Sequence, residues 1–124
     1  MAVEVRGGTL AGPAEAARRL GVTIKALRVY EARGLLTPRR TRRGWRYYAP
    51  EDLERLSRAL AFKAMGFGLS QIATLLDATP DEVAAALVAQ DRQLRQRRAA
   101  LDDALEALRV ARGRLGATGL RLAA

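Results

Sequence analysis

The feature that most constrains the fold is a long stretch near the C-terminus without helix-breaking residues. Thr79, Pro80 and Glu82 mark its start, because threonine caps a helix, proline fits the first turn and glutamate completes a capping box. No proline or glycine follows until Gly113. This allows a helix of about 33 residues, roughly 50 Å long. We expect one helix over residues 78–112 and a flexible tail over residues 113–124.

Leucine occurs at every seventh position of this helix: Leu87, Leu94, Leu101, Leu108 and Leu115. Leu105, with Ala104 and Ala111, widens the apolar stripe in its second half, whereas polar and charged residues flank the stripe in its first half. One helix cannot bury such a stripe on itself, so a partner helix and a homodimer are expected. The alternative is that the helix folds back on its own domain.

Positive charge is concentrated at the other end of the chain. Of a net charge of +9, most lies in residues 1–50, which carry 11 basic and 3 acidic side chains. Nearly all the basic residues are arginines, which codon bias in a GC-rich genome would also produce. Codon bias does not explain the asymmetry along the chain. A local basic surface favours a polyanion, most often a nucleic acid.

Several kinds of chemistry are excluded by missing residue types. The chain has no cysteine and no histidine, which excludes disulfides, thiolate nucleophiles, Cys/His zinc sites, iron–sulfur clusters and histidine acid–base catalysis. Asp102 and Asp103 are neighbours, which do not face each other on a helix. We expect no enzyme, no metal and no cofactor. Without an apolar run of membrane-spanning length or a signal peptide, we expect a cytoplasmic protein with no membrane contact.

The first half of the sequence indicates two short helices. Residues 1–9 are expected to form a flexible arm. Pro13 opens a helix that Gly21 ends after Leu20, and Thr23 caps a second helix that runs to about Arg33. Two helices joined by so short a turn form a helix-turn-helix, which alone is a weak signal.

A basic and aromatic segment follows over residues 39–48. It holds five arginines within eight residues, together with tryptophan and two tyrosines, and no acid lies between Glu31 and Glu51. Aromatic residues favour strands and Gly44 favours a turn. We predict a small β-hairpin, called the wing below, with its tip near residues 41–44 and in contact with nucleic acid.

Two further helices complete a small core, giving one domain over residues 10–77. The first opens at Pro50 and ends at Gly66, with leucines at three- and four-residue spacing on one face. The second starts at Gly68 or Ser70 and turns its apolar residues inward.

These elements together resemble the MerR family of bacterial transcription regulators. The residues that carry the resemblance are 17–31, Gly34 to Leu36, Pro38, Gly44 to Tyr48, the helix start at Pro50 to Leu56, and Gly66 to Leu69 with Ile72, Leu75 and Leu76. The resemblance covers residues 10–77, and the long helix fits the dimerisation arm of the family.

The resemblance implies a mainly α fold: a winged helix-turn-helix followed by a long dimerisation helix that forms an antiparallel coiled coil. The implied partners are a second copy, double-stranded DNA with an inverted repeat at a promoter, which the dimer distorts, and RNA polymerase at the same promoter. The resemblance implies groove contacts by Thr23, Lys25 and Arg28, and phosphate or local-fold roles for Tyr30, Arg46 and Tyr48. Arg18, Arg39, Arg40, Arg42 and Arg43 complete the candidate DNA contacts.

Three residues depart from the pattern of the family. Val29 and Trp45 stand where tyrosines are usual, which removes two hydroxyl groups available to phosphate. Gly68 replaces a capping serine and is a weaker but allowed cap. The sequence also lacks the cysteines of metal-sensing members and a large effector domain. We therefore expect a short member of the family without an effector domain, and heat-shock repressors of the wider family are one model for such a protein.

Two other hypotheses remain open. One is an architectural or excisionase-like protein that binds DNA without sequence specificity. The other is a coiled-coil adaptor that binds an acidic protein through the wing. A fixed dimer distinguishes the first hypothesis from a specific regulator, because paired half-sites require fixed spacing.

Overall fold

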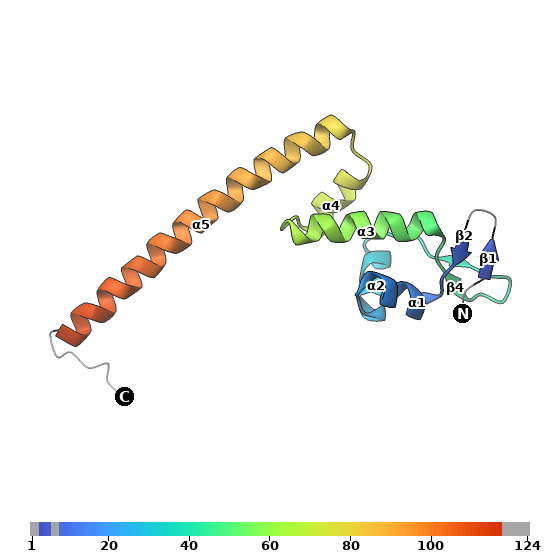
Figure 1. Ribbon diagram of the computed structural model, residues 1–124, viewed down its shortest axis with the longest axis horizontal. Coiled ribbons are helices and arrows are strands. Elements are labelled where there is room, and N and C mark those ends of the chain that lie inside the picture. The colour runs from blue at the N-terminus through green and yellow to red at the C-terminus, as the bar shows by residue number, and fades with distance from the viewer. Residues whose placement is uncertain (1–2, 6–7, 118–124) are drawn as a thin grey trace. The chain divides into compact units, whose positions relative to one another are not determined.

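The computed structural model describes residues 3–5 and 8–117, with side chains from Leu10 onward. The fold is mainly helical (Figure 1). Its elements are, in chain order, β1 (Val3–Val5), β2 (Gly8–Leu10), α1 (Pro13–Leu20), α2 (Ile24–Ala32), β3 (Arg39–Arg40), β4 (Arg46–Tyr47), α3 (Pro50–Ala64), α4 (Leu69–Leu76) and α5 (Pro80–Ala117). The chain divides into two compact units, residues up to Val83 and residues from Ala84 onward.

The first unit is built around α3. Figure 1 shows α1 and α2 on one side of this helix, and α4 packs against it. Its core is formed by buried apolar side chains from all four helices and the loops between them: Ala16, Ala17, Leu27, Tyr30, Leu35, Leu36, Tyr48, Leu56, Ala59, Phe62, Phe67, Ile72, Leu75 and Leu76. The rings of Phe62 and Phe67 meet edge to face, with centroids 5.9 Å apart.

The helix-turn-helix forms as the sequence predicts. Gly21 has a φ of 68°, a left-handed conformation that glycine adopts without steric cost, and it lets the chain leave α1. The Thr23 hydroxyl oxygen accepts a hydrogen bond from the Ala26 N–H at 3.0 Å and so caps α2. These two signals fix the angle between α1 and α2.

The wing is a two-stranded antiparallel hairpin with Arg39 opposite Tyr47 and Arg40 opposite Arg46. Its turn closes where predicted, because the Gly44 N–H donates to the Thr41 carbonyl at 2.8 Å. Two strands of this length cannot stand alone. They are held by backbone hydrogen bonds between Ala11 and Tyr48, of 2.7 and 2.9 Å, which join the wing to the segment before α1.

Arg55 ties α3 to its neighbours. Its Nε donates to the Leu35 carbonyl at 3.1 Å, and its Nη1 lies 2.9 Å from the Asp77 carboxylate at the end of α4. The ion pair lowers the pKa of the Asp77 carboxyl group through the hydrogen bond from Arg55. One arginine therefore links the exit of α2, the middle of α3 and the loop before α5.

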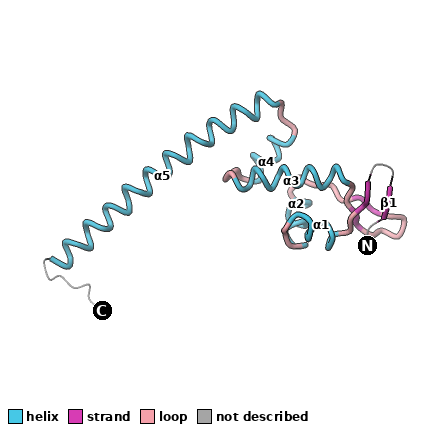
Figure 2. Tube along the Cα trace, viewed as in Figure 1, coloured by secondary structure: helices cyan, strands magenta, loops and turns pink. Residues whose placement is uncertain are grey.

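Two expectations about the ends of the chain were wrong. The loose arm expected for residues 1–9 includes β1 and β2, which pair as antiparallel strands with Val3 opposite Leu10 (Figure 2). Alternating valines with glycines at positions 7 and 8 are a hairpin signal. The long helix also does not end at residue 112, because α5 continues through Gly113 to Ala117. A glycine costs a helix about 1 kcal/mol relative to alanine, which good helix formers on both sides can offset. The remaining tail residues, 118–124, lie outside the described part.

The start of α5 agrees with the sequence. The Thr79 N–H donates to the Glu82 carboxylate at 3.0 Å, and the Glu82 N–H donates to the Thr79 hydroxyl oxygen at 3.2 Å. This is the reciprocal capping box that the sequence predicts. No helix in the described part of the chain is both long and apolar enough to cross a membrane.

Glycine substitutions should have opposite effects at two positions. Gly34 has a φ of 76°, and nothing lies within 4 Å of the place that a Cβ atom would occupy, so Gly34→Ala imposes only the backbone cost of that conformation. We expect a loss of about 1–2 kcal/mol in the free energy of unfolding, measured by urea titration. Gly113→Ala, inside α5, should instead increase helix stability by about 0.5–1 kcal/mol. Equal effects of both substitutions would contradict this assignment.

Candidate nucleic-acid interface

The second helix of the helix-turn-helix presents two free cationic groups. Lys25 and Arg28 are exposed on α2, and neither forms an ion pair within the described residues. Arg18 on α1 is also exposed, but its guanidinium binds the Glu15 carboxylate at 2.6 Å and lowers the pKa of that carboxyl group through hydrogen bonding. Lys25 and Arg28 are therefore the positive groups of the helix-turn-helix most available to a partner.

A buried carboxylate joins α2 to the wing. The side chain of Glu31, 8% exposed, accepts a hydrogen bond from the Tyr48 hydroxyl group. It also lies 3.5 Å from Nε of Arg46 in β4. Burial, and then the nearby Glu31 carboxylate, raise the pKa of the Tyr48 phenol, which stays protonated as a donor. These contacts fix the position of the wing relative to α2.

Both tyrosines among the candidates are buried. Tyr48 is fully buried, which favours the local-fold role over the phosphate contact among the two roles that the resemblance implies. The ring of Tyr30 is also buried, and its hydroxyl oxygen lies 3.3 Å from Nζ of Lys63 on α3. Sequence reasoning missed Lys63, because no local spacing shows that α3 brings its ammonium group to α2.

The arginines of the wing fall into two groups. Arg39 binds Asp52 at 2.9 Å and Glu51 at 2.9 Å, and Arg40 donates to the Gly44 carbonyl at 2.7 Å. These contacts hold the wing against α3 and close its turn. Arg42 and Arg43, at the tip, are exposed and have no ion-pair partner in the described part of the chain. The free positive charge of the wing is thus greatest at its tip.

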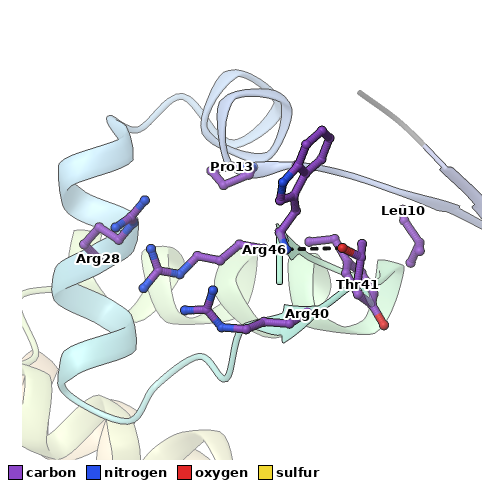
Figure 3. Close-up of a pocket in the computed structure, with 9 residues that line it drawn as sticks. Leu10, Pro13, Arg28, Arg40, Thr41 and Arg46 are labelled. Atoms are coloured by element: carbon purple, nitrogen blue, oxygen red, sulfur yellow. Dashed lines mark hydrogen bonds between the residues drawn. The ribbon is translucent and has the colours of Figure 1, made fainter. Parts of the chain in front are cut away.

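A hollow of about 490 Å³ separates α2 from the wing (Figure 3). Its lining residues come from the end of β2, the start of α1, α2, and the strands and turn of the wing: Leu10, Gly12, Pro13, Arg28, Arg40, Thr41, Trp45, Arg46 and Tyr47. Figure 3 shows the side chains of Arg40 and Arg46 extending toward α2, where Arg28 lies. Trp45, whose side chain is the most exposed aromatic of the described residues at 62%, forms part of the wall; the sequence marked it only as a departure.

A second, smaller hollow of about 200 Å³ lies beside other residues of α2. Ala26, Val29 and Tyr30 line it from α2, Lys63 from α3 and Leu69 from α4. The second helix therefore has a cation-lined hollow beside each of two faces. Thr23, at the start of α2, is exposed although its oxygen is engaged in the cap. Within residues 10–117, acidic side chains form no group of three suited to a metal ion.

A helix-turn-helix, a basic wing and free cations on both define a winged-helix DNA-binding protein. The chain belongs to the MerR family. The family model described as "MerR HTH family regulatory protein" matches residues 13–79, and the one described as "MerR, DNA binding" matches residues 53–118. Together the two models span residues 13–118 of the chain.

Relatives and solved structures agree with this membership. The HTH-type transcriptional regulator SkgA of Caulobacter vibrioides is 43% identical over 79 residues, which are 63% of this chain and 31% of SkgA. MtaN, the N-terminus of the Bacillus subtilis multidrug transporter activator, is similar with a TM-score of 0.76 and 33% identity, covering 81% of this chain and 95% of that one.

A third similar protein was solved with DNA. HiNmlR, a MerR family regulator lacking the sensor domain and bound to promoter DNA, has a TM-score of 0.59 and 26% identity, over 90% of this chain and 94% of that one. The chain spans about a third of the length of the first curated relatives, 31% of SkgA and 35% of the activator mta of Bacillus subtilis.

The joint between α2 and the wing can be tested with neighbouring tyrosines. Tyr48→Phe removes the hydroxyl group that donates to the buried Glu31 carboxylate. We expect a loss of about 1–3 kcal/mol in the free energy of unfolding by urea titration, because the carboxylate loses a donor that water cannot fully replace. Tyr47→Phe, at a half-buried position next in sequence, is the matched control and should change stability little. Equal stability of both variants would show that the hydroxyl group does not support the fold.

Proposed function

We propose that the protein is a homodimer that binds an inverted repeat in promoter DNA and reads it with α2. The observation that supports this most directly is the placement of α2, with the free cations Lys25 and Arg28 exposed and a cation-lined hollow beside each of two faces. A helix in the major groove lies between two sugar-phosphate backbones. The hollow beside the wing would take one backbone, and the hollow beside Lys63 would face the other.

The cations proposed to contact DNA fall into two groups, those on α2 and those at the tip of the wing. Arg28 and Lys25 project from the helix that enters the groove, so they are proposed to contact base edges, with Thr23 at the start of that helix. Arginine is suited to guanine because its guanidinium binds two acceptors at once. Arg42 and Arg43 at the tip of the wing are proposed to bind phosphates, which position the protein without reading sequence.

The second unit is proposed to supply the dimer contact. Leu101, Leu105 and Leu108 are each more than half exposed in the single chain. A contiguous apolar stripe of this length on a solvent-facing helix is typical of a coiled-coil seam. A second copy of the same helix would bury it.

Charge along α5 favours an antiparallel pair. The heptad leucines are symmetric about Leu101, so an antiparallel pair centred there places residues 92–98 of one chain beside residues 104–110 of the other. Residues 91–98 carry four arginines and one aspartate, whereas residues 102–106 carry three acids and no base. In this register residues 102–106 of one chain lie beside residues 96–100 of the other, which include Arg97 and Arg98. A parallel pair would place like charges together, which is unfavourable.

A rigid dimer would bind DNA only where the two half-sites lie at a fixed spacing. The two α2 helices would be held at one spacing by the coiled coil, and a duplex that does not match this spacing must bend or twist to bind both. Distortion of a promoter in this way would alter its use by RNA polymerase, and would take place in the cytoplasm, where the bacterial nucleoid lies.

Base and phosphate contacts should respond differently to substitution. On a duplex obtained by binding-site selection, Arg28→Ala should cost about 1–3 kcal/mol of binding free energy, and much less on random DNA. Arg42→Ala or Arg43→Ala should weaken binding to both duplexes about equally and reduce the salt slope by about one. Fluorescence anisotropy over a series of salt concentrations measures both. If Arg28→Ala weakened binding to both duplexes equally, the protein would fit the architectural, non-specific hypothesis instead.

The seam of α5 can be tested with lysine substitutions. Leu101→Lys and Leu108→Lys each place a charge in the proposed interface of both chains. Each lost leucine removes about 1.5–3 kcal/mol per protomer, enough to weaken dimerisation about a hundredfold or more. Val110→Lys, on the opposite face of the same helix, is the matched control and should leave the dimer intact. Sedimentation equilibrium gives the dissociation constants, and a wild-type monomer at micromolar concentration would overturn the coiled coil.

A further inference from the structure

The hollow between α2 and the wing has the properties of a small-molecule site. Its volume, about 490 Å³, lies within the range of ligand pockets in proteins. Pro13 and Leu10 line one side, and the rings of Trp45 and Tyr47 contribute further apolar surface. A simple hydrated ion gains little from such walls, whereas a flat apolar group would lose contact with water by packing against them.

The charged groups of the hollow are all cationic. Three arginines line it, Arg28, Arg40 and Arg46, and no lining residue is acidic. The acid closest to Arg46, Glu31, already accepts a hydrogen bond from Tyr48. The positive charge on this side of the hollow therefore exceeds the negative charge that the protein provides for it.

One of these arginines also lacks a hydrogen-bond acceptor. Nε of Arg46 is buried and has no hydrogen-bond partner in the described part of the chain, because Glu31 lies 3.5 Å away, within ion-pair range but outside hydrogen-bond geometry. A buried donor without an acceptor is costly. An anion bound beside Arg28 and Arg46 would give Arg28 a negative partner within the described part of the chain, where it has none, and would add to the charge that Arg46 receives from Glu31.

We propose that this hollow binds a planar aromatic carboxylate. The carboxylate would accept hydrogen bonds from the guanidinium groups of Arg28 and Arg46, a geometry for which arginine is suited. The ring would pack against Trp45 and Pro13. Tight binding requires both the carboxylate and the ring of the ligand, because the arginines of the hollow bind the first and its apolar walls bind the second.

Binding of such a ligand would compete with DNA. This part of the inference rests on the proposed function, in which the same hollow takes a sugar-phosphate backbone. A carboxylate between α2 and the wing would occupy Arg28, which is proposed to read bases, and would fill the space beside Arg46 that the backbone takes. The DNA-binding unit itself would then respond to a small molecule.

The test uses the full chain and calorimetric titration with 2-naphthoate. The matched ligand 2-naphthamide has the same rings without the charge, and acetate has the charge without the rings. We expect one naphthoate bound per chain, with the amide and acetate each binding about tenfold more weakly or worse. Arg28→Gln and Trp45→Ala should each weaken naphthoate binding by a similar factor. Arg58→Gln, at an exposed position on α3 outside the hollow, is the control and should leave it unchanged, with circular dichroism confirming that all variants are folded.

The outcomes separate the ligand site from the proposed function. Absence of naphthoate binding by folded protein, or binding that survives both Arg28→Gln and Trp45→Ala, overturns the ligand site whether or not DNA binds. Naphthoate binding that these substitutions weaken, together with a loss of DNA affinity as naphthoate is added, supports both. Binding weakened by the substitutions in a protein that does not bind DNA supports the ligand site and overturns the proposed function.

Discussion

The contact between Glu31 and Tyr48 is the constraint on which the candidate nucleic-acid interface depends. It joins two elements that are 17 residues apart in sequence, the helix that presents Lys25 and Arg28 and the hairpin that presents Arg42 and Arg43. The hydrogen bond lies in a buried place, where a donor and an acceptor are worth more than in water. Arg46, beside the same carboxylate, extends this joint to the wall of the hollow. This contact therefore helps to hold α2 and the wing, the two elements on either side of the hollow, in position.

Most of the fold could be predicted from the sequence, because its signals are local. Gly21 and Thr23 define the turn between α1 and α2, and Thr79 with Glu82 defines the start of α5, by contacts spanning only a few residues. The sequence-based predictions were wrong where glycine is compatible with more than one local structure. Gly8 was interpreted as part of a flexible arm but lies in β2, which pairs with β1, and Gly113 was interpreted as a helix end but lies inside α5.

The candidate site could be predicted only as a set of charges. The sequence shows how many arginines the wing has, but it does not show which of them are neutralised. Arg39 is engaged by Asp52 across 13 residues, whereas Arg42 is free at the tip. Lys63 reaches Tyr30 only because α3 packs beside α2. Such long-range pairings depend on the packing of helices, which no local pattern encodes, and they decide which charges are available to DNA.

A symmetric dimer would place two copies of α2 on one duplex. Hydroxyl-radical footprinting on a duplex obtained by binding-site selection tests it most directly, because the radicals report protection of each sugar along both strands. For a symmetric dimer we expect two protected patches related by a dyad. Their centres should be separated by about one helical turn of 10–10.5 base pairs, or a multiple of it. A single asymmetric patch, or protection without defined position, would contradict the claim.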